Sequence, residues 1–235
     1  MEITLPKRVA LKDLWDVGMN FSTTLVLALN IGARGLFWWY VPQHVSRFYD
    51  EIRDLEQDAE VVAERVPVLR LDWGNLVLSQ TELEHVVLCF GALARLRPGG
   101  TAPALNHYRM ALSLLAKSDI FLPFEVNAFQ QFYLALREAM RAFGGWDGVT
   151  PYAEALDNYM REYETYADDR ERYLGLAERI EVGEMSDVSA NLEDAGKMKL
   201  LADGYFIQQF GEMRRAWMSG KSATMPGSTR PESNT

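Results

Sequence analysis

The chain is poor in cysteine and histidine, with one cysteine, Cys89, and three histidines in 235 residues. A single cysteine cannot form an intramolecular disulfide and leaves no cysteine cluster for zinc. We therefore expect a reducing, cytosolic setting. The N-terminus lacks the basic and then apolar pattern of a signal peptide. An apolar run at residues 21–32 is shorter than the roughly 20 residues that a membrane span needs, and it predicts a buried core helix instead.

Sequence motifs of catalysis and cofactor binding are also missing. No Gly-x-Ser-x-Gly is present, and Gly220-Lys221-Ser222 lacks the earlier glycine and the preceding strand of a phosphate-binding loop. Cys89 lies in an apolar stretch, where its thiol would resist ionisation, so we expect a core residue rather than a nucleophile. These absences predict a protein without enzymatic activity and without a cofactor.

Glu82 and His85 form the one arrangement with metal-ligand spacing. Three residues apart on a helix, they share a face, as one half of a di-iron site requires. The other two histidines have no glutamate three residues before them, so the second half is missing. Ser79 and Glu82 also match a capping box. We therefore expect Glu82 to complete a cap, His85 to be an ordinary polar residue, and no metal to bind.

Charge is unevenly distributed along the chain, whose net charge is −9. Residues 91–145 hold six basic and three acidic residues, a net charge of +3, whereas residues 150–200 hold thirteen acids and six bases, a net charge of −7. A basic middle region could present a groove to a phosphate backbone. The alternative is that these are scattered surface residues. The candidate phosphate contacts are Arg34, Arg95, Arg97, Arg109, Lys117, Arg137 and Arg141.

Two long stretches carry apolar stripes of nearly heptad spacing. In Thr150–Glu184 tyrosines recur every seven residues, and most other positions are charged, which predicts one long helix capped by Thr150. Val45–Val66, after Pro42, has an unbroken a/d pattern over three heptads. Either stripe could pack within the chain or between subunits. The candidate self-association residues are Tyr152, Tyr159, Tyr163, Tyr166, Tyr173, Phe48, Ile52 and Leu55.

The remaining segments also predict helices, so the fold class is all-α. We expect them at Lys7–Val17, after Ser22, from Ser79 to about Leu96, at Pro103–Lys117, from Pro123 to Gly144, after Ser186, and in a last helix beyond a break at Asp203-Gly204. Val68–Trp73 alternates like a strand but has no visible partner, which suggests an extended connector. We expect residues 1–218 to form one helical domain, with lobes 1–145 and 146–218 as an alternative, and residues 219–235 to form a flexible tail.

Four stretches follow one another in the order seen in a known family. Leu25–Gly35 (LVLALNIGARG) is an apolar helix ending in Arg-Gly, and Leu78–Leu96 is a capped helix. Tyr108–Ser113 is a tyrosine-arginine segment, and Asp168–Leu176 is a charged helix near the end. They resemble segments of the all-helical nucleoproteins of segmented negative-strand RNA viruses, of the phenuivirus kind. The resemblance covers under a quarter of the chain.

That resemblance implies two helical lobes, a positive RNA cleft and an N-terminal arm that grips the next subunit. The chain departs from it by its net negative charge and by the short segment before Leu25. Our first hypothesis is a non-enzymatic protein that self-associates and coats viral RNA, in the host cytoplasm or the virion, without contact with a membrane. The second is an acidic helical adaptor that binds another protein. The third is an enzyme within a helical bundle, with Glu82 and His85 as its starting point.

Overall fold

The computed structural model describes residues 11–40, 68–73, 77–96, 101–118, 123–162, 169–184 and 189–220. These residues form seven helices and a two-stranded sheet, which confirms the all-α class. The chain divides into two compact units, Met1–Ala94 and Arg95–Thr235, here called the N-terminal and C-terminal units. This boundary differs from the alternative lobes 1–145 and 146–218, because helices on both sides of residue 145 pack together in the C-terminal unit.

The N-terminal unit is built on two packed helices, α1 (Leu11–Gly32) and α3 (Gln80–Leu93). α1 is one continuous helix, so the separate helices expected at Lys7–Val17 and after Ser22 are wrong. The helices touch at Gly32, where an added Cβ would lie 2.5 Å from the backbone nitrogen of Val86. Cys89 is fully buried, as predicted. α3 begins with the predicted capping box of Ser79 and Glu82 but ends at Leu93, before the expected Leu96.

A small antiparallel sheet completes this unit. Strand β1 (Leu36–Tyr40) pairs with β2 (Val68–Trp73), so Val68–Trp73 is a sheet strand and the expected connector is wrong. The aromatic sequence of β1 suits a strand, but its partner lies far along the chain and no local pattern reveals it. Asn30, buried in α1, fixes the sheet: its side chain donates to the carbonyl of Phe37 at 2.7 Å and accepts from the Phe37 N–H at 3.0 Å.

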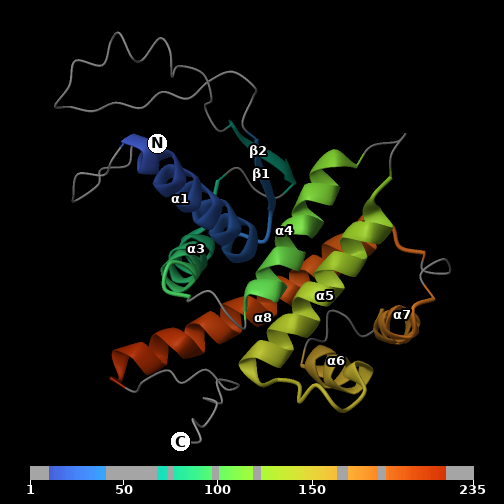
Figure 1. Ribbon diagram of the computed structural model, residues 1–235. Coiled ribbons are helices and arrows are strands. Elements are labelled where there is room, and N and C mark those ends of the chain that lie inside the picture. Colours follow the sequence, from blue (N-terminus) through green and yellow to red (C-terminus); the bar gives the residue numbers. More distant parts are fainter. Residues whose placement is uncertain are drawn as a thin grey trace, which may run out of the picture. The chain divides into compact units, whose positions relative to one another are not determined.

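The C-terminal unit contains α4 (Ala102–Lys117), α5 (Glu125–Phe143), α6 (Tyr152–Arg161), α7 (Arg170–Val182) and α8 (Leu192–Met218). α4 and α5 lie side by side, and α8 packs across α5 (Figure 1). The predictions for Pro103–Lys117 and for the helix that Gly144 ends are confirmed within one or two residues. Gly144 ends α5 in the left-handed conformation, with φ of 82°, where glycine is favoured.

The core of this unit surrounds the middle of α8. Most residues of Asp194–Phe206 are buried, whichever side of the helix they occupy, so this stretch is an internal helix. Aromatic rings meet it from other helices: Tyr108 of α4 makes an edge contact with Phe206, and Tyr159 of α6 with Tyr205. The break expected at Asp203-Gly204 is wrong, because tertiary burial keeps the segment helical.

The single helix expected over Thr150–Glu184 is also wrong. α6 ends at Arg161 and α7 begins at Arg170, while residues 163–168 lie outside the described part. Tyr152 packs on Tyr133, and Tyr173 packs on Phe129, with ring centroids 5.2 and 5.9 Å apart. The two α5 residues are one turn apart, whereas a straight helix would separate Tyr152 from Tyr173 by about 30 Å. Only two shorter helices can place both tyrosines on α5.

The caps of these helices also differ from the expectation. Pro151 occupies the N-cap of α6, and the Thr150 hydroxyl donates to Asp147 instead. Asn191 caps α8 in a capping box with Asp194, while Ser186 lies outside the described residues. The same holds for the helix expected at Val45–Val66 and for most of the tail expected at 219–235. No described helix is long and apolar enough to cross a membrane.

Candidate functional site

The candidate phosphate contacts on α5 are largely neutralised. Arg137 donates to Glu181 of α7 at 2.8 Å and pairs with Glu138 at 3.3 Å. Arg141 is 60% exposed but lies 3.7 Å from the same Glu138. Burial alone would lower the pKa of Arg137, yet the hydrogen bond with Glu181 and the two carboxylates together raise it. Arg137 is therefore a structural cation that joins α5 to α7.

Four candidates outside α5 are described, and none of them has an ion-pair partner among the described residues. Arg95 is exposed at the start of the C-terminal unit, and Arg109 and Lys117 are exposed on α4. Arg34 is exposed in the N-terminal unit, directly after α1, and holds a left-handed conformation with φ of 52°. Arg97 lies outside the described residues. Three candidates of the C-terminal unit thus keep their charge available to a ligand.

A second basic group, which the sequence analysis missed, lies at the C-terminal end of α8. Arg214 and Arg215 are exposed there, and Arg215 pairs with Glu212. The Arg95 guanidinium lies over the ring of Trp217, 5.1 Å from its centroid. The signal in the sequence was the spacing of Arg214 and Trp217, which puts both on one helix face. The α8 end, defined here as Arg95 with residues 212–217, combines cations with an aromatic ring.

The middle of α8 holds a different charged group, the buried cluster of Lys199, Asp203 and Tyr108. Lys199 and Asp203 are fully buried and pair at 2.6 Å. The Tyr108 hydroxyl donates to the other oxygen of Asp203 at 2.5 Å, and Lys199 Nζ lies 5.7 Å from the centre of the Tyr108 ring. Each charge compensates the other in a region without access to water. This cluster fastens α4 to α8.

Three of the five tyrosines proposed for self-association pack inside the C-terminal unit. Tyr152, Tyr159 and Tyr173 are buried, with 2%, 6% and 0% exposure. Burial raises the pKa of Tyr152 and Tyr173 well above the ordinary value for tyrosine. Their rings belong to the core, so a contact with another subunit would need the unit to open. The five other candidates lie outside the described residues: Tyr163, Tyr166, Phe48, Ile52 and Leu55.

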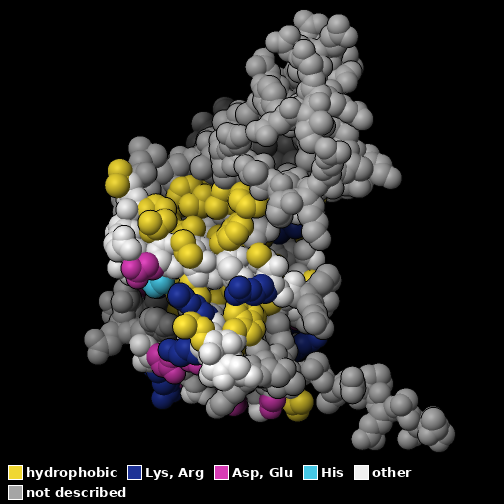
Figure 2. Space-filling view, turned by 90° about the vertical axis from the view of Figure 1, so that its left-hand side faces the viewer, with side chains coloured by type: hydrophobic (Ala, Val, Ile, Leu, Met, Phe, Trp, Pro, Cys, Tyr) yellow, Lys and Arg dark blue, Asp and Glu magenta, His cyan; other side chains and the backbone are white. Residues whose placement is uncertain are grey.

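An apolar stripe on α3 offers an exposed surface instead. Leu83 and Val87 are one turn apart and are 46% and 61% exposed. α3 lies on the side of the N-terminal unit that faces the viewer in Figure 2, where hydrophobic side chains gather. On the same helix Glu82 is used as a cap: hydrogen bonds from the backbone and hydroxyl of Ser79 lower the pKa of Glu82. The described residues contain no group of three His, Cys, Asp or Glu side chains that could hold a metal ion.

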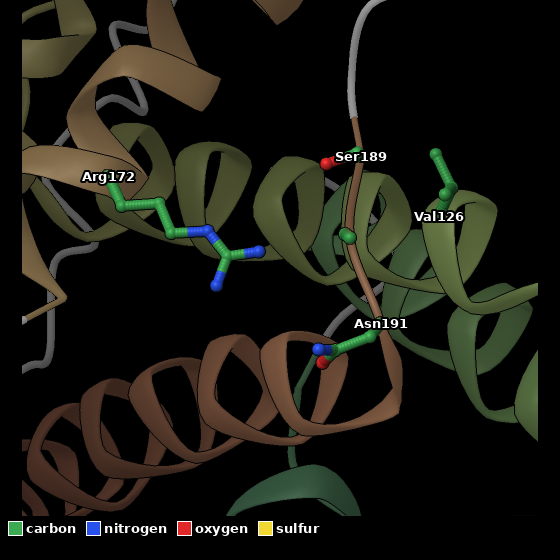
Figure 3. A pocket seen from close by; sticks show the side chains of 5 residues that line it. Val126, Arg172, Ser189 and Asn191 are labelled. Atoms are coloured by element: carbon green, nitrogen blue, oxygen red, sulfur yellow. The ribbon is translucent and has the colours of Figure 1, made fainter.

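A pocket of about 330 Å³ lies between α7 and the start of α8, lined by Val126, Arg172, Ser189, Ala190 and Asn191. Arg172 extends from α7 toward the segment that carries Ser189 and Asn191 (Figure 3). Its guanidinium donates to Asp194 at 2.7 Å. The backbone N–H of Asn191 donates to the Asp194 carboxylate, and the backbone N–H of Asp194 donates to the side-chain oxygen of Asn191. The chain's own carboxylate thus occupies the position that an anion would take.

Ion pairs also join α6 to α7. Asp157 of α6 accepts from Arg161, one turn on, and from Arg170 of α7. The hydrogen bond from Arg170, followed by that from Arg161, holds the pKa of Asp157 below its ordinary value. Lys197 of α8 pairs with Asp169 at 2.6 Å and Glu193 at 2.9 Å, which raises the pKa of Lys197. These pairs neutralise Asp157, Asp169 and Glu193 of this acidic region.

Comparisons with family models, curated proteins and solved structures found no match for the chain. The fold and the charges described above are therefore the basis of the functional argument.

Proposed function

We propose that the chain is a non-enzymatic helical protein that self-associates and packages single-stranded RNA, as a viral nucleocapsid or coat protein does. The observation that carries the proposal is the set of exposed cations without ion-pair partners in the described part of the C-terminal unit. They are Arg95, Arg109, Lys117 and Arg214. A chain of net charge −9 can still bind a polyanion when its uncompensated cations are local and its carboxylates are paired elsewhere.

The proposed self-association uses α3 rather than the buried Tyr152, Tyr159 and Tyr173. Leu83 and Val87 form an exposed apolar stripe, and such a stripe is a common feature of helical contacts between subunits. Cooperative assembly along RNA would let a few cations per subunit suffice. In this proposal the protein acts in the host cytoplasm or the virion, with RNA and copies of itself as partners.

The first test is size-exclusion chromatography with light scattering, recording the ratio of absorbance at 260 and 280 nm. We expect large particles with a raised ratio, which falls after nuclease and high salt. A monomer or dimer with a protein-like ratio, unchanged by salt, would contradict the proposal.

Charge reversal then locates the binding surface. We expect the variant Arg109→Glu/Lys117→Glu to weaken binding of a single-stranded RNA at least tenfold, because each lost phosphate contact reduces counterion release. Arg161→Glu on α6 is the control, since Arg161 already pairs with Asp157. The control reverses one charge and the test variant two, so a pure net-charge effect predicts that Arg161→Glu loses half as much binding free energy as the double variant. That result would contradict a specific surface.

A second candidate function is a protein-binding adaptor. α7 exposes Glu171 and Glu178, and an acidic helix face can bind a basic partner. This candidate predicts no affinity for RNA and a loss of partner binding when those two residues are changed to glutamine, so the same chromatography separates it from the first.

A further inference from the structure

The α8 end contains a ring and a cation in direct contact. Arg95 is exposed and lies over Trp217, which is half-buried, with 5.1 Å from the guanidinium carbon to the ring centroid. A cation–π contact of this kind contributes about 0.5–1 kcal/mol at an exposed site. Since that energy is small, the guanidinium can move from the ring to another partner at low cost.

The surroundings of the ring carry positive charge. Arg214 lies three residues before Trp217, and so on the same face of α8. Arg214 is exposed and has no ion-pair partner among the described residues, while Arg215 pairs with Glu212. Met218, the next residue, is 78% exposed. The end of the helix therefore presents two available guanidinium groups beside one aromatic ring.

This combination matches the chemistry of single-stranded nucleic acid. Proteins that bind single strands without sequence preference stack bases on aromatic side chains and track the backbone with cations. A duplex hides its base faces inside the stack, so a ring of this kind discriminates against it. A folded acidic partner would engage the arginines but would gain nothing from the indole face.

We propose that Trp217 is a base-stacking platform for single-stranded RNA, with Arg95 and Arg214 binding the phosphates on either side. This inference rests on the proposed RNA packaging and gives it a subsite and a substrate class. When a base stacks on the indole, Arg95 turns from the ring toward the phosphate. The subsite tolerates any base, because every base has a π-face.

The experiment compares the full chain and its variants on three probes of equal length: a 12-nucleotide oligouridylate, a 12-nucleotide abasic ribose-phosphate strand and a 12-base-pair RNA duplex. We expect the unchanged protein to bind oligouridylate about tenfold more tightly than either other probe. We expect Trp217→Ala to weaken oligouridylate binding about tenfold without changing binding of the abasic strand. Trp217→Phe, which keeps an aromatic face, should lose no more than about threefold.

Met218→Ala is the matched control, because it removes an exposed neighbour that has no π-face; we expect it to bind all probes as the unchanged protein does. Far-UV circular dichroism checks that each variant is folded. The stacking inference is overturned, while RNA packaging survives, by either of two results. Either Trp217→Ala weakens binding of the abasic strand and of oligouridylate equally, or it leaves binding of both probes unchanged. If the unchanged protein binds no probe, the proposed function itself fails, and the inference with it.

Discussion

The two halves of α8 use charged residues in opposite ways. In the middle of the helix, Lys199 and Asp203 have no exposed surface and pair with each other. At the end, Arg215 and Glu212 also pair, but their side chains are 71% and 59% exposed, and Arg214 has no ion-pair partner among the described residues. The same residue types on one helix are thus structural in one half and accessible in the other.

This difference follows from the solvent. A charge moved into a protein interior loses its hydration, and only a partner at hydrogen-bond distance offsets that loss. A charge at the surface stays hydrated, so its ion pair contributes little and the group is free to bind a ligand. Burial, rather than residue type, decides which cations of this chain can serve a functional site. Arg137 and Arg95 show the same contrast, one paired with Glu181 and the other exposed.

The largest effect is expected for breaking the buried pair on one side only. Lys199→Met leaves the Asp203 carboxylate buried without its cation, and we expect it to lower the free energy of unfolding by about 3–5 kcal/mol. Denaturant titration followed by circular dichroism measures this. A loss below about 1 kcal/mol would mean that water reaches the cluster, and the contrast within α8 would fail.

Removing the whole cluster is the control for that variant. The triple variant Lys199→Met/Asp203→Leu/Tyr108→Phe removes both buried charges together with the Tyr108 hydroxyl that donates to Asp203. We expect it to recover most of the stability, to within about 2 kcal/mol of the unchanged protein. A triple variant as unstable as Lys199→Met would show that packing volume, not charge, determines stability here.

A similar contrast between buried and open positions occurs in α1, at two glycines. An added Cβ at Gly32 would lie 2.5 and 2.6 Å from backbone atoms of Val86, whereas Gly18 has nothing within 4 Å. We expect Gly32→Ala to destabilise the protein by about 1–3 kcal/mol by forcing α1 from α3. Gly18→Ala should instead stabilise it by up to about 1 kcal/mol. Hydrogen exchange of α1 and α3 measures both, and equal effects would contradict the close contact.

The features that sequence analysis predicted are those with local causes. The capping box of Ser79, the helix at Pro103–Lys117 and the stop at Gly144 depend on neighbouring residues, and the structure has them. The sheet, the continuity of α8 through Asp203 and the interruption of the tyrosine helix depend on contacts between distant segments. Such contacts leave no periodic pattern in one segment, so reading that segment alone could not reveal them.

The candidate site shows the same division. Arg95 was named from its charge, but its contact with Trp217 joins residues more than a hundred positions apart. Arg137 was named for the same reason, although Glu181 neutralises it across 44 positions. Local charge counts identified the basic region of the chain. They could not tell a cation that holds two helices together from one that is available to a phosphate.

A smaller effect, which depends on pH, is expected at an ion pair of intermediate exposure. Asp157 is 16% exposed, and its hydrogen bonds with Arg170 and Arg161 lower its pKa from the ordinary 3.8. A carboxylate whose folded pKa is lowered contributes full stability above the unfolded pKa and loses it as the pH falls toward the folded value. The α6–α7 contact should therefore weaken below about pH 4.

Asp157→Asn isolates this contribution from the other carboxylates. The variant should be less stable than the unchanged protein at pH 7, and the difference in melting temperature should shrink as the pH falls from about 4 to 2. Thermal unfolding at several pH values measures the difference. A gap that stays constant with pH would mean that the Asp157 charge does not stabilise the contact between α6 and α7.

The smallest effect on stability is expected at the exposed end of α8, where a substitution can change RNA binding without changing the stability of the fold. Arg215→Gln removes an ion pair that is open to solvent, so we expect the free energy of unfolding to change by less than about 0.5 kcal/mol. If RNA binds at this end, Arg214→Gln should reduce the slope of log affinity against log salt by about one, because one phosphate contact is lost. Arg215→Gln should leave that slope nearly unchanged, because Arg215 is held by Glu212. Glu212→Gln, which removes the competing carboxylate, should shift affinity in the opposite direction. Salt titrations of RNA binding measure the slopes, and denaturant titration of Arg215→Gln measures its stability. If the stability of Arg215→Gln fell as it does for Lys199→Met, the comparison would fail, since the end of α8 would then be structural like its middle.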